Sequence, residues 1–149
     1  MGDVDLAAAG AESPSDELLF YRMDFMPLYT LTTQIGVFSA QAKSDLATRL
    51  TQLHSQYAGV PPNWVHVVFQ EYAVGSGFTA GKPAATAALT LLIRTGRSPE
   101  YKRGLLTRLW ELFQAATGAP DDQIVIGIQE VPPSQAMEMG QIMPEVAGQ

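Results

Sequence analysis

Short stretches typical of strands alternate along the chain with longer stretches in which apolar residues recur at helical spacing. Residues 27–34, PLYTLTTQ, are rich in β-branched and aromatic residues and predict a strand. From Ser39, which fits an N-cap, apolar residues recur every three or four positions as far as Gly59. That spacing predicts an amphipathic helix packed on a sheet. A proline pair ends the helix, and residues 64–71, WVHVVFQE, predict a second strand.

The second half of the chain repeats this order. Residues 88–94, ALTLLIR, predict a strand, and residues 123–130, QIVIGIQE, predict another. Between them lies a predicted helix with apolar residues at helical spacing: Leu105, Leu106, Leu109, Trp110 and Phe113. VVFQEYAVGS and IGIQEVPPSQ both leave a strand through Gln-Glu, which indicates an internal duplication. We therefore expect an α+β fold of two βαβ units, with a four-stranded sheet and both helices on one face. The other face then needs a cover, so we expect a homo-oligomer.

The first 26 residues differ in composition from the rest. They hold six acidic residues against one basic residue, and they mix Ala, Gly, Ser and Pro without a sustained apolar period. We therefore expect residues 1–26 to be a disordered leader or a mis-assigned start, and residues 27–149 to form the single domain.

Composition excludes several classes of protein. The sequence has no cysteine, so disulfides, a thiolate nucleophile and zinc-thiolate sites are absent. Only two histidines are present, and no metal-ligand pattern is visible, so we expect no metal. No apolar run approaches the roughly 20 residues of a membrane span, and there is no signal-peptide pattern, which indicates a cytoplasmic protein. Five of the basic residues fall between Arg94 and Arg108, which favours a local anion site over nucleic-acid binding.

The glycine-rich segment GSGFTAGKPA does not fit a nucleotide-binding loop. Ser76 stands where the first glycine of a Walker motif belongs, and Pro83 stands where a magnesium-binding Ser or Thr belongs. The segment also precedes a predicted strand instead of a helix, which argues against a dinucleotide fingerprint. We therefore expect a surface loop.

Four side chains remain as candidates for chemistry. Arg94 and Arg97 flank a Thr-Gly turn before a helix that opens with Ser98 and Pro99, so both guanidiniums could bind one carboxylate, although they could equally face solvent or pair with acids. His54 lies just off the apolar stripe of the first helix, where a histidine is commonly a boundary residue. Glu138 lies among methionines, where its pKa could rise enough for proton transfer or where it could simply be exposed.

With these residues placed, residues 27–149 resemble the cis-3-chloroacrylic acid dehalogenase group of the tautomerase superfamily. The resemblance is carried by PLYTLTTQ, LTQLH, VVFQE, IRTGRS and VPPSQAMEMGQIMP. It implies a trimer whose catalytic group is an amino-terminal proline, here Pro27. It also implies that His54 is the family's helix histidine, that Arg94 and Arg97 bind the substrate carboxylate, and that Glu138 activates water.

The activity that this resemblance implies is cofactor-independent tautomerisation of a small 2-oxo, enol or unsaturated carboxylate. A terminal proline has a secondary amine that can accept a proton, whereas an amide nitrogen cannot. In a dehalogenase, Glu138 and His54 would instead help to add water to a double bond. The family's active-site tyrosine falls on Gly127 here, and Pro27 is internal in the sequence as written. Tautomerase is therefore the first interpretation, dehalogenase or hydratase the second, and a non-catalytic carboxylate-binding protein the third. Phe69, Phe78 and Trp64, or atoms from a neighbouring subunit, are candidates for the pocket wall.

Overall fold

The computed structural model describes residues 26–144, so most of the expected leader lies outside the described residues. Four long strands and two long helices make up the domain: β1 (Leu28–Gln34), α2 (Ala40–Ala58), β2 (His66–Tyr72), β5 (Ala87–Arg94), α3 (Pro99–Thr117) and β6 (Ile124–Val131). Two short hairpins follow β2 and β6, namely β3 (Phe78–Thr79) with β4 (Lys82–Pro83), and β7 (Met137–Glu138) with β8 (Gln141–Ile142). Short 3-10 helices cover Pro62–Trp64, Asp121–Gln123 and Pro133–Gln135.

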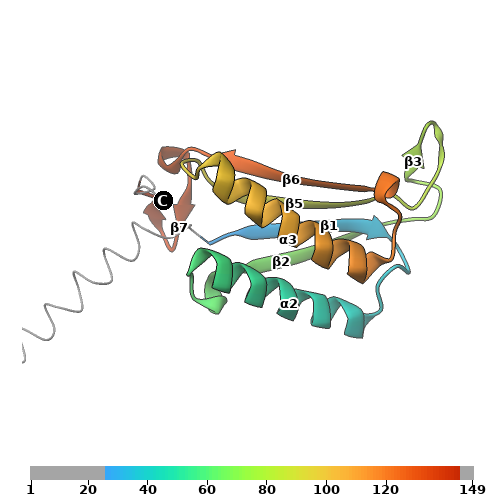
Figure 1. The fold of residues 1–149 in the computed structure, drawn as a ribbon, viewed down its shortest axis with the longest axis horizontal. Helices are drawn as coiled ribbons and strands as arrows, with labels where there is room; N and C mark the ends of the chain where they lie inside the picture. The colour runs from blue at the N-terminus through green and yellow to red at the C-terminus, as the bar shows by residue number, and fades with distance from the viewer. Residues whose placement is uncertain (1–25, 145–149) are drawn as a thin grey trace, which may run out of the picture.

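The four long strands form one sheet in the order β2-β1-β5-β6. β1 pairs with β2 and β5 pairs with β6 in parallel, while β1 and β5 pair antiparallel in the middle. Both helices cover the same face of this sheet (Figure 1). The prediction of two βαβ units with both helices on one face is confirmed. The antiparallel centre follows if the second unit is related to the first by a two-fold rotation.

A pseudo-two-fold relation between the halves can be read from the register. Thr30 lies opposite Thr90, and Leu31 and Leu89 pair in the same way as Tyr29 and Leu91. The helix ends match as well. Ser39 and Ser98 cap the two N-termini with their hydroxyls, and glycines in the left-handed conformation end both helices. The long strands and helices of the first half therefore have structural counterparts in the second.

The core lies between the helices and the sheet. Alternate residues of β1 and β5 point toward the helices and are buried, and they pack against apolar residues of α2 and α3. The opposite face is not covered by any described element, and it exposes Val68 on β2 and Val125 on β6 to 45% and 66%. The end of this open face beside the β7–β8 hairpin contains the candidate site.

Candidate active site

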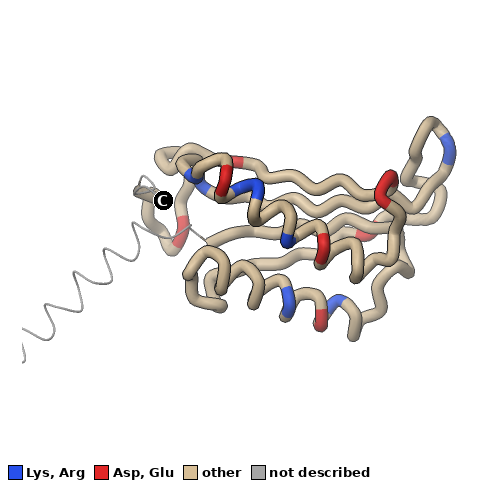
Figure 2. The backbone as a smooth tube through the Cα atoms, in the orientation of Figure 1, with Lys and Arg blue, Asp and Glu red and all other residues tan. Residues whose placement is uncertain are grey.

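A pocket of about 560 Å³ lies where the open face of the sheet meets the β7–β8 hairpin. Its wall combines the apolar floor of the sheet with the hairpin: Met26, Leu28, His66, Val68, Leu92, Val131, Gln135, Ala136, Met137 and Glu138. Acidic and basic positions gather at this end of the molecule (Figure 2). The lining is mostly apolar with a few polar side chains, His66, Gln135 and Glu138, a combination typical of small-molecule sites.

Glu138 is the acidic residue of the pocket wall. Its Oε1 accepts a hydrogen bond of 2.7 Å from the backbone N–H of Met26, which immediately precedes Pro27. Burial raises the pKa of this carboxyl from 4.5 to about 7, against the opposing effects of the Met26 N–H and the charge of Arg94. At neutral pH the carboxyl is therefore close to half-protonated, which suits proton transfer. Its position on a two-residue strand, followed by Met139 at φ 51° and Gly140 at φ 77°, aims it back across the sheet.

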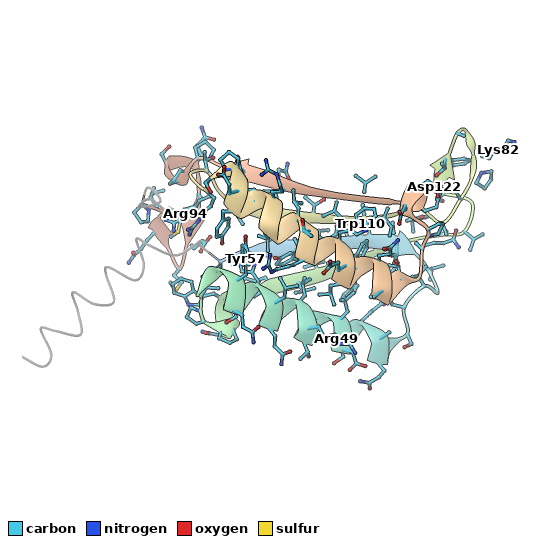
Figure 3. All side chains as sticks on the ribbon, in the orientation of Figure 1. Arg49, Tyr57, Lys82, Arg94, Trp110 and Asp122 are labelled. Carbon is cyan, nitrogen blue, oxygen red and sulfur yellow. The ribbon has the colours of Figure 1, made fainter. Side chains whose placement is uncertain are left out.

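Arg94 ends β5 beside Glu138 and is almost completely buried, with 1% of its surface exposed. Its Nη1 donates a hydrogen bond of 2.6 Å to the carbonyl oxygen of Pro144, so the chain after β8 folds over it. Arg94 is labelled in Figure 3 at the end of the sheet opposite Lys82 of the β3–β4 hairpin. A buried guanidinium in this place supplies a fixed positive charge beside the pocket.

Arg97 follows the turn that joins β5 to α3 and has 8% of its surface exposed. Gly96 has φ 131°, which only glycine adopts readily, and it redirects the chain from the strand into the helix. The guanidinium of Arg97 lies over the ring of Tyr101, with its carbon 5.0 Å from the ring centroid. Both candidate arginines are thus held against their own structural partners and are not extended into solvent.

His54 lies on the helix side of the sheet. It is fully buried, and its Nδ1 shares a hydrogen bond of 2.5 Å with the hydroxyl of Tyr29 on β1, which is also fully buried. His54 is not among the described residues that line the pocket. It stands the same number of residues before the end of α2 as Phe113 does before the end of α3, and Tyr29 corresponds to Leu89 in β5. The polar pair Tyr29 and His54 of the first half is thus replaced by the apolar pair Leu89 and Phe113 in the second half.

The pseudo-two-fold relation shows that the other end of the sheet lacks this chemistry. The counterpart of Arg94 is Gln34, and the counterpart of Glu138 is Thr79. Pro27 corresponds to Ala87. The fold therefore does not itself require an arginine, an acid and a histidine at such an end, since the other end is built without them.

Several pocket residues were not predicted from the sequence. His66, Leu28 and Leu92 form one row across the open face, because Leu28 pairs with both of the others. The suggestion that Phe69 and Phe78 line the pocket is wrong. Phe69 packs against Phe38 on the helix side at 5.7 Å, and Phe78 belongs to the hairpin at the opposite end. The alternation of β2 could have identified His66, since it places His66 opposite in direction to Val67.

Groups of three or more side chains able to bind a metal are absent from the part of the chain that the structure describes. Within residues 26–144, neither helix is long and apolar enough to cross a bilayer. No curated protein matches the sequence.

Comparison with known proteins shows which family the chain belongs to. Residues 26–149 match the family described as "Putative oxalocrotonate tautomerase enzyme". A solved structure titled native Ps01740 is 35% identical, with a TM-score of 0.71 over 74% of this chain and 99% of that one. N1, a member of the cis-3-chloroacrylic acid dehalogenase family, is 25% identical, with a TM-score of 0.72 over 80% of this chain and 85% of that one. A fused 4-OT symmetric trimer shares the fold at 24% identity and a TM-score of 0.70, over 78% and 94%. The chain belongs to this tautomerase family and is a member of the tautomerase superfamily similar to the cis-3-chloroacrylic acid dehalogenases.

Proposed function

We propose that the protein is a cofactor-independent tautomerase that moves a proton between oxygen and carbon of a small 2-oxo, enol or unsaturated carboxylate. Met26 is absent from the proposed active form, but in the full chain its N–H shows how close the residue before Pro27 lies to Glu138. The observation that carries this proposal is that 2.7 Å hydrogen bond, taken as a measure of this nearness. It brings the chain segment at Pro27 to a half-buried acid, next to the buried charge of Arg94. Proton transfer needs a base, an acid and a fixed charge within reach of one pocket.

Pro27 is the proposed base. Its nitrogen is basic only when Pro27 is the first residue, because the Met26–Pro27 peptide bond makes it an amide. Burial of Pro27 and the nearby charge of Arg94 would lower the pKa of such an amine toward neutrality. The neutral amine would then take the proton of an enol hydroxyl and return it to the neighbouring carbon.

Arg94 and Arg97 are the proposed carboxylate-binding residues. Both are more than nine-tenths buried, and they lie on either side of the turn that opens α3. Guanidiniums held in this way can bind a carboxylate and stabilise the enolate charge that develops during proton transfer. Glu138 is the proposed second proton-transfer group. His54 is the remaining proposed catalytic residue, and its proposed role is to help add water in the second candidate reaction. It lies on the helix side of the sheet, where it shares a hydrogen bond with Tyr29.

Hydrolytic dehalogenation or hydration of a 3-haloacrylate is the second candidate. The 25% identity to N1, of the cis-3-chloroacrylic acid dehalogenase family, favours it. In that reaction Glu138 would activate the water, protonated Pro27 would supply the proton to the neighbouring carbon, and in a dehalogenation the resulting halohydrin would then lose halide and a proton. A Cβ built at Gly127, where that family has a tyrosine, meets no atom within 4 Å among the described residues, so the described chain leaves open space at this position.

A homotrimer is the proposed assembly. The open face of the sheet carries exposed valines, Val68 in the pocket wall and Val125 toward the other end, and the fused 4-OT relatives of the same fold have been solved as trimers. Burial of such a face between copies would also complete the pocket wall, which no described element closes on that side.

The test compares protein that begins at Pro27 with protein that retains Met26, using ketonisation of phenylenolpyruvate. We expect activity only in the first form, loss of that activity in Pro27→Ala, and at least a tenfold loss of kcat/KM in Arg94→Ala. Intact mass of natively expressed protein tells which form occurs. If protein that begins at Pro27 is inert but binds carboxylates, a non-catalytic binding protein takes the place of the enzyme. If it neither reacts nor binds, both proposals fail.

A further inference from the structure

Four side chains from the two helices and the β5–α3 turn stack into one column. The Arg97 guanidinium lies 5.0 Å from the centroid of the Tyr101 ring. The Tyr101 and Tyr57 ring centroids lie 5.0 Å apart, with the ring planes at 58°. Arg108 completes the column on the other side of Tyr57, at 4.9 Å from its centroid. The order along the column is therefore cation, ring, ring, cation. Each guanidinium contacts the face of one ring, which is a favourable arrangement.

Backbone contacts fix this column in place. The Tyr57 hydroxyl donates a hydrogen bond of 2.8 Å to the carbonyl oxygen of Tyr101, and the Tyr101 N–H donates one of 3.0 Å to Ser98 Oγ. Tyr57 projects from α2 toward α3, as its label in Figure 3 indicates. It can approach α3 because residue 104 is glycine: a Cβ there would overlap the Tyr57 hydroxyl. A mid-helix glycine weakens a helix, so its presence here is explained by the space that Tyr57 needs.

We propose that this column positions Arg97 for the substrate, with Tyr101 and Tyr57 as positioning residues. The inference rests on the proposed role of Arg97 in carboxylate binding. An arginine side chain has many rotamers, and holding the guanidinium before the substrate arrives lowers the entropy lost on binding. Arg108, at the outer end of the column, lines an open hollow of about 520 Å³ on the helical face. The column therefore runs from the solvent-exposed helical face to the turn beside the pocket.

The experiment compares Tyr101→Leu with Tyr101→Phe in protein that begins at Pro27. The leucine variant loses the ring beneath Arg97, and we expect its KM for phenylenolpyruvate to rise about fivefold to tenfold, with kcat within twofold of wild type. The phenylalanine variant keeps the ring and should retain the wild-type KM. Trp110→Leu is the matched control, because it removes an aromatic residue from the same helix away from Arg97 and should leave KM unchanged. Tyr57→Leu, which removes the second ring, should raise KM by a smaller factor.

A second readout does not depend on activity. In a ¹H–¹⁵N spectrum of the arginine side chains, the ring current of Tyr101 should shift the Arg97 Nε–H resonance, which is assigned with Arg97→Lys. We expect this shift to persist in Tyr101→Phe and to disappear in Tyr101→Leu.

The two readouts separate failure of this inference from failure of the proposed function. An unshifted Arg97 resonance in wild type, or a folded Tyr101→Leu protein with wild-type KM, would overturn the positioning role. A shifted resonance in a protein that neither binds nor converts carboxylates would overturn the role toward substrate together with the proposed function. If Tyr101→Leu does not fold, the KM of Tyr57→Leu decides the question: a raised KM supports the positioning role, and a folded Tyr57→Leu protein with wild-type KM overturns it.

Discussion

The hydrogen bond between Tyr29 and His54 allows a quantitative test of the site's helix side. Tyr29→Phe removes the hydroxyl that meets His54 Nδ1 at 2.5 Å, in a place where neither residue is exposed. The phenylalanine ring keeps the packing of the tyrosine ring while the contact of the hydroxyl with His54 is lost. Leaving a buried polar group without this partner costs about 1–3 kcal/mol of unfolding free energy.

The expected stability of the double variant follows from the corresponding residues in the second half of the chain. Leu89 and Phe113 occupy the corresponding positions, and both are buried there without a polar pair. Tyr29→Phe combined with His54→Phe should therefore be tolerated better than the two single variants suggest. We expect each single variant to lose about 1–2 kcal/mol and the double variant to lose less than their sum by about 1–2 kcal/mol.

The assay is urea denaturation of the four proteins at one pH, followed by far-UV circular dichroism. A control cycle combines Tyr29→Phe with Tyr72→Phe, whose hydroxyl donates to the Thr86 carbonyl oxygen at 2.5 Å at the other end of the domain. That pair should be additive within about 0.5 kcal/mol. Additive losses in the Tyr29 and His54 cycle would refute the reasoning, because they would mean that the two side chains do not stabilise each other.

Three other substitutions test the packing and electrostatics of the described residues. The folded-state pKa of Glu138, about 7, lies above its ordinary value of 4.5, so the folded chain holds the proton between these values and loses stability as pH rises through them. Relative to Glu138→Gln, wild type should lose about 1–2 kcal/mol over that window in urea titrations, a figure discounted because the group is half-exposed; a flat difference would contradict the raised pKa. Thr33→Val should raise the unfolding free energy by about 1 kcal/mol, because the buried Thr33 hydroxyl has no hydrogen-bond partner among the described residues; calorimetry that gives a lower Tm would contradict this. Gly104→Ala, which normally favours a helix by about 1 kcal/mol, should instead lower the Tm, because its Cβ would overlap the Tyr57 hydroxyl.

Local pattern was enough to predict the scaffold. Periodicity located both long helices with the serines that begin them and the glycine that ends the first, and the repeated strand-helix-strand order predicted the sheet and the single helical face. These features depend on neighbours in sequence and on the general handedness of βαβ units, both of which one sequence contains.

The wall of the pocket could not be predicted in the same way. Leu28, His66 and Leu92 come together only through the register of β1 with β2 and β5, and an alternating strand does not specify that register. The contact of Glu138 with the Met26 backbone joins residues that are far apart in the sequence, so no local sequence pattern predicts it. Sequence likewise identified His54 without its partner Tyr29, because a histidine near an apolar stripe is consistent with several surroundings.

The pseudo-two-fold relation between the halves sets a limit on how many catalytic centres one polypeptide can carry. Ala87 occupies the place in the second half that Pro27 occupies in the first, and its nitrogen lies within a continuous backbone. A duplicated chain has only one amino terminus. A reaction that depends on a terminal amine can therefore take place at one end of the sheet only, although the fold offers two equivalent ends. An inactivator directed to the active-site amine should therefore label one equivalent per polypeptide, and a ratio near two would mean that a group other than the terminal nitrogen is labelled as well.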